Sequence, residues 1–141
     1  MMTNNNNFFL NNYLADLNCL SSALDKNCLI KIAEAIIETA KSKGTIIIVG
    51  NGGSAAISSH VAVDFLKAVS IKAITFNESS LITCYANDYG YENWVKEALI
   101  SHAQKDDTII LISSSGESPN ILNAAKYAIS KDLNLITFSG F

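Results

Sequence analysis

The sequence predicts an α/β fold built around a parallel sheet. Short runs of branched apolar residues alternate with longer segments in which apolar residues recur every three or four positions. The short runs are nearly continuous in apolar residues, which is typical of strands buried on both faces. Turns rich in glycine or serine follow two of these runs. These observations indicate a parallel sheet with helices on both faces and ligand-binding turns at the carboxyl ends of strands.

Two helical segments are expected before the alternating region. Apolar residues recur at helical spacing over residues 10–24 and again over residues 29–40. Asp25 is suited to cap the second helix at its start. Gly44, which follows two lysines, is suited to end that helix at the C′ position.

Strands and helices then alternate along the rest of the chain. The expected strands are Thr45–Val49, Ile71–Phe76, Thr108–Ile112 and Asn134–Phe138. The expected helices are Ala55–Ala68, Ser80–Tyr85, Glu92–Ala103 and Pro119–Ser130. Trp94 is expected to pack in the core or at a subunit interface.

The asparagine-rich start of the chain, residues 1–7, is expected to be a disordered tail, followed by one domain over residues 8–141. The chain ends directly after the last predicted strand. A parallel strand needs cover on both faces, so we expect the C-terminal part of the domain to be missing, with an oligomeric partner as another source of cover.

Composition narrows the class of protein. The chain has 141 residues, 49% of them hydrophobic, and a net charge of −3, which is typical of one globular domain. All ten basic residues are lysines, and they are scattered, which argues against nucleic-acid binding. The apolar runs are too short for a membrane span, and no signal peptide is apparent. The three cysteines lack metal-site spacing, so we expect buried reduced thiols and a cytoplasmic protein.

The first functional motif is the turn Gly50-Asn51-Gly52-Gly53-Ser54, placed between a predicted strand and a predicted helix. Backbone N–H groups at such a turn form an anion site that suits phosphate. His60 and Asp64 follow four residues apart, and therefore on one face of the helix. The turn also fits a loose dinucleotide-binding pattern, with Glu78 as an imperfect ribose acid, or a purely structural glycine turn.

A second turn, Ser113-Ser114-Ser115-Gly116-Glu117-Ser118, precedes a helix that starts with the only proline of the chain. Its hydroxyls and N–H groups surround a helix N-terminus, so a chain without arginine could hold a phosphate dianion there. A plain capping cluster is the alternative interpretation. A dinucleotide fold does not need this second cradle.

Together the two turns, His60 and the segment Ala86-Asn87-Asp88 resemble the sugar isomerase (SIS) domains, in particular the phosphoheptose isomerases. This resemblance implies a flavodoxin-like three-layer α/β/α sandwich, usually a homotetramer with active sites between subunits. It also implies a phosphorylated sugar as ligand. The serines would hold the phosphate, and the other residues would lie along the sugar: Ser113, Ser114, Ser115 and Ser118 for the phosphate; Asn51, Gly52, Gly53, Ser54, Asn87 and Asp88 for the sugar.

The resemblance further implies the conversion of sedoheptulose 7-phosphate to a heptose 7-phosphate for lipopolysaccharide or capsule synthesis. His60 would be a zinc ligand, and Asp64 falls where the family has a glutamate that binds the metal and transfers protons. The family's Gln and His on a C-terminal helix have no counterpart in this chain. The alternative function is a non-catalytic SIS module that binds a sugar phosphate or a protein partner.

Overall fold

The computed structural model describes residues 4–140, with side-chain surroundings from residue 6 onward. The chain divides into two compact units, one up to Lys31 and one from Ile32. Helix α1 (Asn4–Ser22) and the start of α2 (Lys26–Lys41) belong to the first. The prediction of a single domain from residue 8 stays a prediction.

The expected disordered tail is only partly covered by the described residues. Residues 1–3 lie outside them, whereas Asn4–Asn7 form the first turn of α1, so the prediction is wrong for these four. The physical reason is that asparagine lowers helix propensity by less than about 0.7 kcal/mol per residue. A helix formed by the leucine-rich segment that follows therefore continues back through them.

The second unit contains a four-stranded parallel sheet in the order β2-β1-β3-β4. The predicted bounds are confirmed for β3 and β4, while β1 lies one residue later than predicted and β2 is shorter. The strands are β1 (Ile46–Gly50), β2 (Ala73–Thr75), β3 (Thr108–Ile112) and β4 (Asn134–Phe138).

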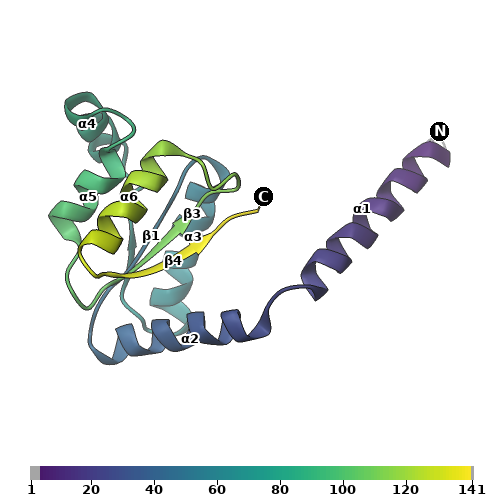
Figure 1. The fold of residues 1–141 in the computed structure, drawn as a ribbon, viewed down its shortest axis with the longest axis horizontal. Coiled ribbons are helices and arrows are strands. Elements are labelled where there is room, and N and C mark those ends of the chain that lie inside the picture. The colour runs from purple at the N-terminus through teal and green to yellow at the C-terminus, as the bar shows by residue number, and fades with distance from the viewer. Residues whose placement is uncertain (1–3, 141) are drawn as a thin grey trace. The chain divides into compact units, whose positions relative to one another are not determined.

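Helices follow the strands as predicted (Figure 1). Their bounds are α3 (Gly53–Ala68), α4 (Ser79–Tyr89), α5 (Trp94–His102) and α6 (Pro119–Ser130). The helix α4 is longer than predicted. It begins where the Glu78 carboxylate accepts hydrogen bonds from the N–H groups of Ser80 and Leu81, and it ends at Gly90, whose φ is 84°.

Alternation along the strands gives the sheet two apolar faces. Ile47 and Val49 pack with α5 and α6, and Trp94 is 1% exposed in that layer, as expected for a core residue. Ile46 and Ile48 point the other way and pack with α3 and the second-unit part of α2. Side chains of alternate strand residues therefore enter opposite layers, and the three-layer α/β/α arrangement is confirmed.

The three cysteines are exposed and free, so the expectation of buried thiols is wrong. Cys19 and Cys28 lie within residues 6–31, where every side chain is exposed because that unit has no core of its own. Cys84, on α4, is exposed as well. Among the described residues, no helix is both long and apolar enough to cross a membrane.

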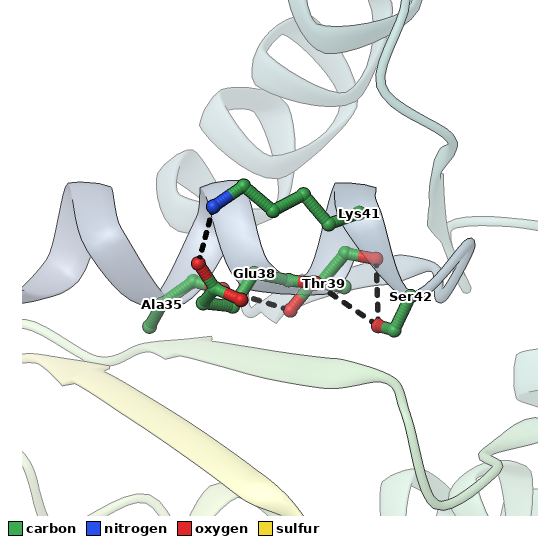
Figure 2. A network of polar contacts seen from close by, with 5 residues as sticks. All are labelled: Ala35, Glu38, Thr39, Lys41 and Ser42. Atoms are coloured by element: carbon green, nitrogen blue, oxygen red, sulfur yellow. Dashed lines mark hydrogen bonds and ion pairs between the residues drawn. The ribbon is translucent and has the colours of Figure 1, made fainter.

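Side-chain hydrogen bonds hold the last turns of α2 (Figure 2). The Thr39 hydroxyl donates to the carbonyl of Ala35 at 2.9 Å, and the Ser42 hydroxyl lies 3.0 Å from the carbonyls of Glu38 and Thr39. Lys41 forms an exposed ion pair with Glu38, which contributes little to stability. Because Thr39 is also 2.6 Å from the Thr108 hydroxyl, this end of α2 is fastened to the start of β3.

The helix α2 does not end as predicted. The C′ residue with positive φ is Lys43 (62°), and the N–H groups of Lys43 and Gly44 bond to the carbonyls of Ala40 and Thr39. Gly44 is needed for a different reason. A Cβ there would lie 2.0 Å from the backbone oxygen of Asp106, so only glycine permits this close approach.

One buried carboxylate fastens the amino ends of β1 and β3. Asp107 is 5% exposed and accepts the N–H of Thr45 at 2.7 Å with one oxygen. Its other oxygen accepts the N–H of Gln104 at 2.8 Å. The two central strands are therefore joined at this edge by a side chain as well as by the sheet.

Candidate functional site

The candidate site lies at the carboxyl edge of the two central strands. From β1 the chain runs through α3 to β2, and from β3 it runs through α6 to β4, so the helices leave toward opposite faces. This is the topological switch point at which such sheets form a ligand crevice. Gly50 pairs with Ile112 in the sheet register. The glycine turn and the serine loop therefore start side by side (Figure 1).

Tight packing shapes the glycine turn. A Cβ at Gly50 would lie 2.6 Å from the Cβ of Ser54 and 3.0 Å from the carbonyl oxygen of Ile112. Gly52 has a φ of 54°, which favours glycine. Gly52 and Gly53 are exposed, and their N–H groups have no backbone acceptor among the described residues. The turn thus presents free donors at the start of α3, as an anion site requires.

The serine loop is ordered by its own hydroxyls. Ser113, which is 7% exposed, donates to the Ser118 hydroxyl at 3.2 Å, and the Ser115 hydroxyl accepts the N–H of Glu117 at 3.2 Å. Ser114 is exposed. Ser118 occupies the N-cap position of α6 as predicted, but its side chain makes no capping hydrogen bond. The Ser118 hydroxyl is therefore not consumed by the helix, which weakens the interpretation of the loop as a capping cluster.

The sequence reasoning missed Asn120, which joins the two turns. Its amide and that of Asn51 pair reciprocally, with both N···O distances at 2.9 Å. The Tyr91 hydroxyl lies 3.4 Å from the same Asn51 oxygen. A signal for Asn120 existed in the sequence, because it shares a helix face with Ala124 and Ala128, both fully buried. A polar residue in such a row needs a hydrogen-bonding partner.

Asn87 and Asp88 lie in the last turns of α4 and are exposed. The Asn87 amide donates to an Asp88 carboxylate oxygen at 2.8 Å, and Asp88 is also near the Cys84 thiol. None of the hydrogen bonds in the described chain joins these two side chains to the glycine turn or the serine loop. The structure leaves them as a separate polar pair on α4.

His60 and Asp64 form an exposed pair on α3. The His60 Nε2 and Asp64 Oδ2 atoms are 3.6 Å apart, and the side chains are 80% and 60% exposed. His60 lies seven residues beyond Gly53, roughly 10 Å along the helix. Two ligand atoms that are each about 2.1 Å from one tetrahedral ion lie roughly 3.4 Å apart, so the pair fits half of a zinc site.

The other half of a metal site is not present in the part of the chain that the structure describes. Residues 4–140 contain no group of three or more His, Cys, Asp or Glu side chains placed to hold a metal ion. The pair alone therefore does not complete the set of four ligands that a zinc ion takes in proteins.

The structure removes the support for dinucleotide binding. The Glu78 oxygens lie 3.1 Å and 2.8 Å from the N–H groups of Ser80 and Leu81. These hydrogen bonds lower the pKa of the Glu78 carboxyl, since they favour its charged form. The carboxylate that the sequence offered as a ribose partner is thus the N-cap of α4.

A polar cavity of about 340 Å³ lies at the opposite edge of the sheet, near the amino ends of β1 and β3. Its walls include Lys43, Lys72 and His102. None of the predicted site residues lines it, so it is separate from the two turns at the carboxyl ends of β1 and β3.

Most of the chain is similar to known proteins. The SIS domain matches residues 12–140. A phosphoheptose isomerase of Helicobacter pylori (strain ATCC 700392 / 26695) is 36% identical over 141 aligned residues, which cover 94% of this chain and 72% of that protein. A phosphoheptose isomerase of Burkholderia pseudomallei (strain 1710b) is 34% identical, but the match spans 78% of this chain and only 59% of the relative.

The fold also matches solved structures. A phosphoheptose isomerase from Francisella tularensis superimposes with a TM-score of 0.83 at 23% identity, covering 98% of this chain and 76% of the other. The chain belongs to the SIS domain family. The solved structure of the Francisella tularensis phosphoheptose isomerase shares its overall fold.

Proposed function

We propose that this chain binds a phosphorylated sugar in the crevice between β1 and β3. The observation that carries the proposal is the serine loop, where the Ser118 hydroxyl stands at the start of α6 without capping it. Hydroxyls, free N–H groups and the positive end of a helix dipole together suit a phosphate dianion. The adjacent glycine turn supplies further donors for the sugar hydroxyls.

We further propose that the chain takes part in isomerising sedoheptulose 7-phosphate to a heptose 7-phosphate, in line with the names of its relatives. A base removes a proton from the carbon beside the ketose carbonyl and leaves an enediolate. A proton then passes from the adjacent hydroxyl to the former carbonyl oxygen, and the base returns its own proton to the former carbonyl carbon, which leaves the new carbonyl at the neighbouring carbon and completes the aldose. Asp64 is the proposed base, and His60, at 3.6 Å, is placed to hold and orient its carboxylate.

We also propose that the same two side chains help to hold a zinc ion. His60 and Asp64 would supply two ligands, and the ion when bound would polarise the sugar oxygens. The described residues supply no third ligand group, so the proton transfers above are assigned to side chains alone.

A non-catalytic sugar-phosphate-binding module is the alternative function. The exposure of His60 and Asp64, 80% and 60%, favours it, because a proton-transfer site usually excludes water. The crevice and the serine loop would serve this function equally well.

We also propose that the chain assembles as a homotetramer. Its proposed role is in the cytoplasm, in lipopolysaccharide or capsule synthesis. The helix α1 supports the assembly, since its large apolar side chains are exposed, as in Phe9, Leu14 and Leu20 at 66%, 54% and 70%. Such a surface marks a site for protein association. Light scattering on the full chain would measure the subunit count, and a monomer would contradict this part of the proposal.

The decisive experiment measures binding and turnover separately. Isothermal titration with sedoheptulose 7-phosphate gives affinity, and NMR with and without zinc gives product. Binding with turnover supports the isomerase, and binding without turnover leaves the non-catalytic module. No binding would refute both.

Replacing Ser118 tests the serine loop. We expect Ser118→Ala to weaken sugar phosphate binding about tenfold, since one hydrogen bond to a charged group is lost. The free energy of unfolding should change by less than about 0.5 kcal/mol, whereas loss of a true serine cap costs about 1 kcal/mol. Ser130→Ala, at the other end of α6, is the matched control because its hydroxyl donates only to the Tyr127 carbonyl.

A further inference from the structure

Asn51 and Asn120 form a closed ring of two hydrogen bonds across the crevice. Each amide donates to the other's oxygen at 2.9 Å. Asn51 comes directly after β1, and Asn120 is the second residue of α6, directly beyond the serine loop. Because two antiparallel hydrogen bonds fix distance and orientation together, the pair sets how the glycine turn lies against the serine loop.

Because one member of the pair is buried, breaking its hydrogen bonds would cost free energy. Asn120 is 1% exposed, while Asn51 is only partly buried. An unpaired amide at the Asn120 position would lose its hydration without compensation. Asn51 has a second partner, the Tyr91 hydroxyl at 3.4 Å, so its orientation is supported from the α4–α5 connection as well.

We infer that Asn120 is a positioning residue that acts through Asn51 to hold the glycine turn at the correct place for the sugar portion of the ligand. The inference rests on the proposed function. Asn120 does not touch the ligand, because its amide faces Asn51 and its side chain is closed from solvent. The serine loop binds the phosphate group without its help.

The test compares two ligands, inorganic phosphate and sedoheptulose 7-phosphate, by isothermal titration of the full chain. Phosphate probes the serine loop, whereas the sugar phosphate needs both turns. We expect Asn120→Ala to raise the Kd of the sugar phosphate about tenfold or more and to leave the Kd of phosphate within about twofold. If that variant does not fold, Asn120→Leu fills the same volume without hydrogen bonds and replaces it in the same test.

Asn123→Ala is the matched control. Asn123 lies one turn further along α6, and its amide donates to the Glu92 carbonyl at 2.9 Å, away from the glycine turn. It should leave the ratio of the two Kd values unchanged. In an Asn51→Ala background, Asn120→Ala should have no further effect on sugar phosphate binding, because its action passes through Asn51.

The outcomes distinguish failure of this inference from failure of the proposed function on which it rests. If the unmodified chain binds the sugar phosphate but Asn120→Ala changes neither Kd, or changes both equally, the inference is overturned and the proposed function stands. An added loss in the Asn51→Ala background also overturns it. If the unmodified chain binds neither ligand, the proposed function is refuted, and the inference that rests on it is refuted as well.

Discussion

The two turns at the carboxyl ends of β1 and β3 and the pair on α3 differ in how firmly the protein holds them. Around the crevice, strand pairing, a reciprocal amide pair and serine hydrogen bonds fix two turns side by side. His60 and Asp64 share only one 3.6 Å contact and are mostly exposed. The comparison teaches that the described chain holds its two turns firmly in place, whereas it leaves the pair on α3 exposed and with no further metal-ligating side chains grouped beside it.

The largest expected effect tests the packing of the crevice. Gly50→Ala should lower the free energy of unfolding by about 1–3 kcal/mol, because its Cβ would meet Ser54 at 2.6 Å and the Ile112 carbonyl at 3.0 Å. Urea denaturation measures the change. Gly53→Ala is the control, since nothing lies within 4 Å of its Cβ position, and it should change stability by less than about 0.5 kcal/mol. Equal effects would show that the turn is not tightly packed.

A smaller effect on stability is expected at the α3 pair. His60→Ala should change the free energy of unfolding by less than about 0.5 kcal/mol, because an exposed side-chain contact of this kind contributes little. If the chain is an isomerase, turnover followed by NMR should fall by roughly 100-fold or more. His102→Ala, the other histidine, is the control and should leave turnover unchanged. A large loss of stability in His60→Ala would contradict the contrast drawn above.

The smallest effect concerns Glu78, which caps α4 from outside the crevice. Its pKa is lowered in the folded state by hydrogen bonds from Ser80 and Leu81, so the ionised cap stabilises the fold above the ordinary carboxyl pKa. That contribution is lost as the pH falls through the lowered pKa. Thermal unfolding of Glu78→Gln and the unmodified chain should therefore differ at pH 7 and converge in acid. A difference that persists in acid would contradict the capping role.

Sequence patterns predicted the fold well because strand and helix periodicity are local signals. The bounds of β3, β4 and α6 match, and both candidate turns lie where the predicted strands end. The sequence patterns failed at positions where a contact with a distant segment determines the local structure. Gly44 is required by the backbone of Asp106, and Lys43 takes the positive φ in its place. The pairing of Asn51 with Asn120 spans 69 residues, so no local pattern could show it.

For the candidate site, too, the sequence predicted the local features and missed those that depend on contacts in the folded chain. The sequence identified the glycine turn and the serine loop, whose chemistry lies within six consecutive residues each. It could not say that the Ser118 hydroxyl is left free by the helix it precedes, or that Asn87 and Asp88 bond to each other. Those facts depend on side-chain orientation, which spacing along the chain does not determine.

Because Asp107 joins β1 and β3 at their amino ends and the asparagine pair joins them at their carboxyl ends, the two central strands are fastened at both edges. Their amide protons should therefore be among the slowest in the sheet to exchange with solvent. The spacing of the two turns is set before any ligand arrives. Binding of the proposed sugar phosphate would then require little additional ordering of the backbone, and its affinity could be tuned by single side chains of the turns without remodelling the sheet.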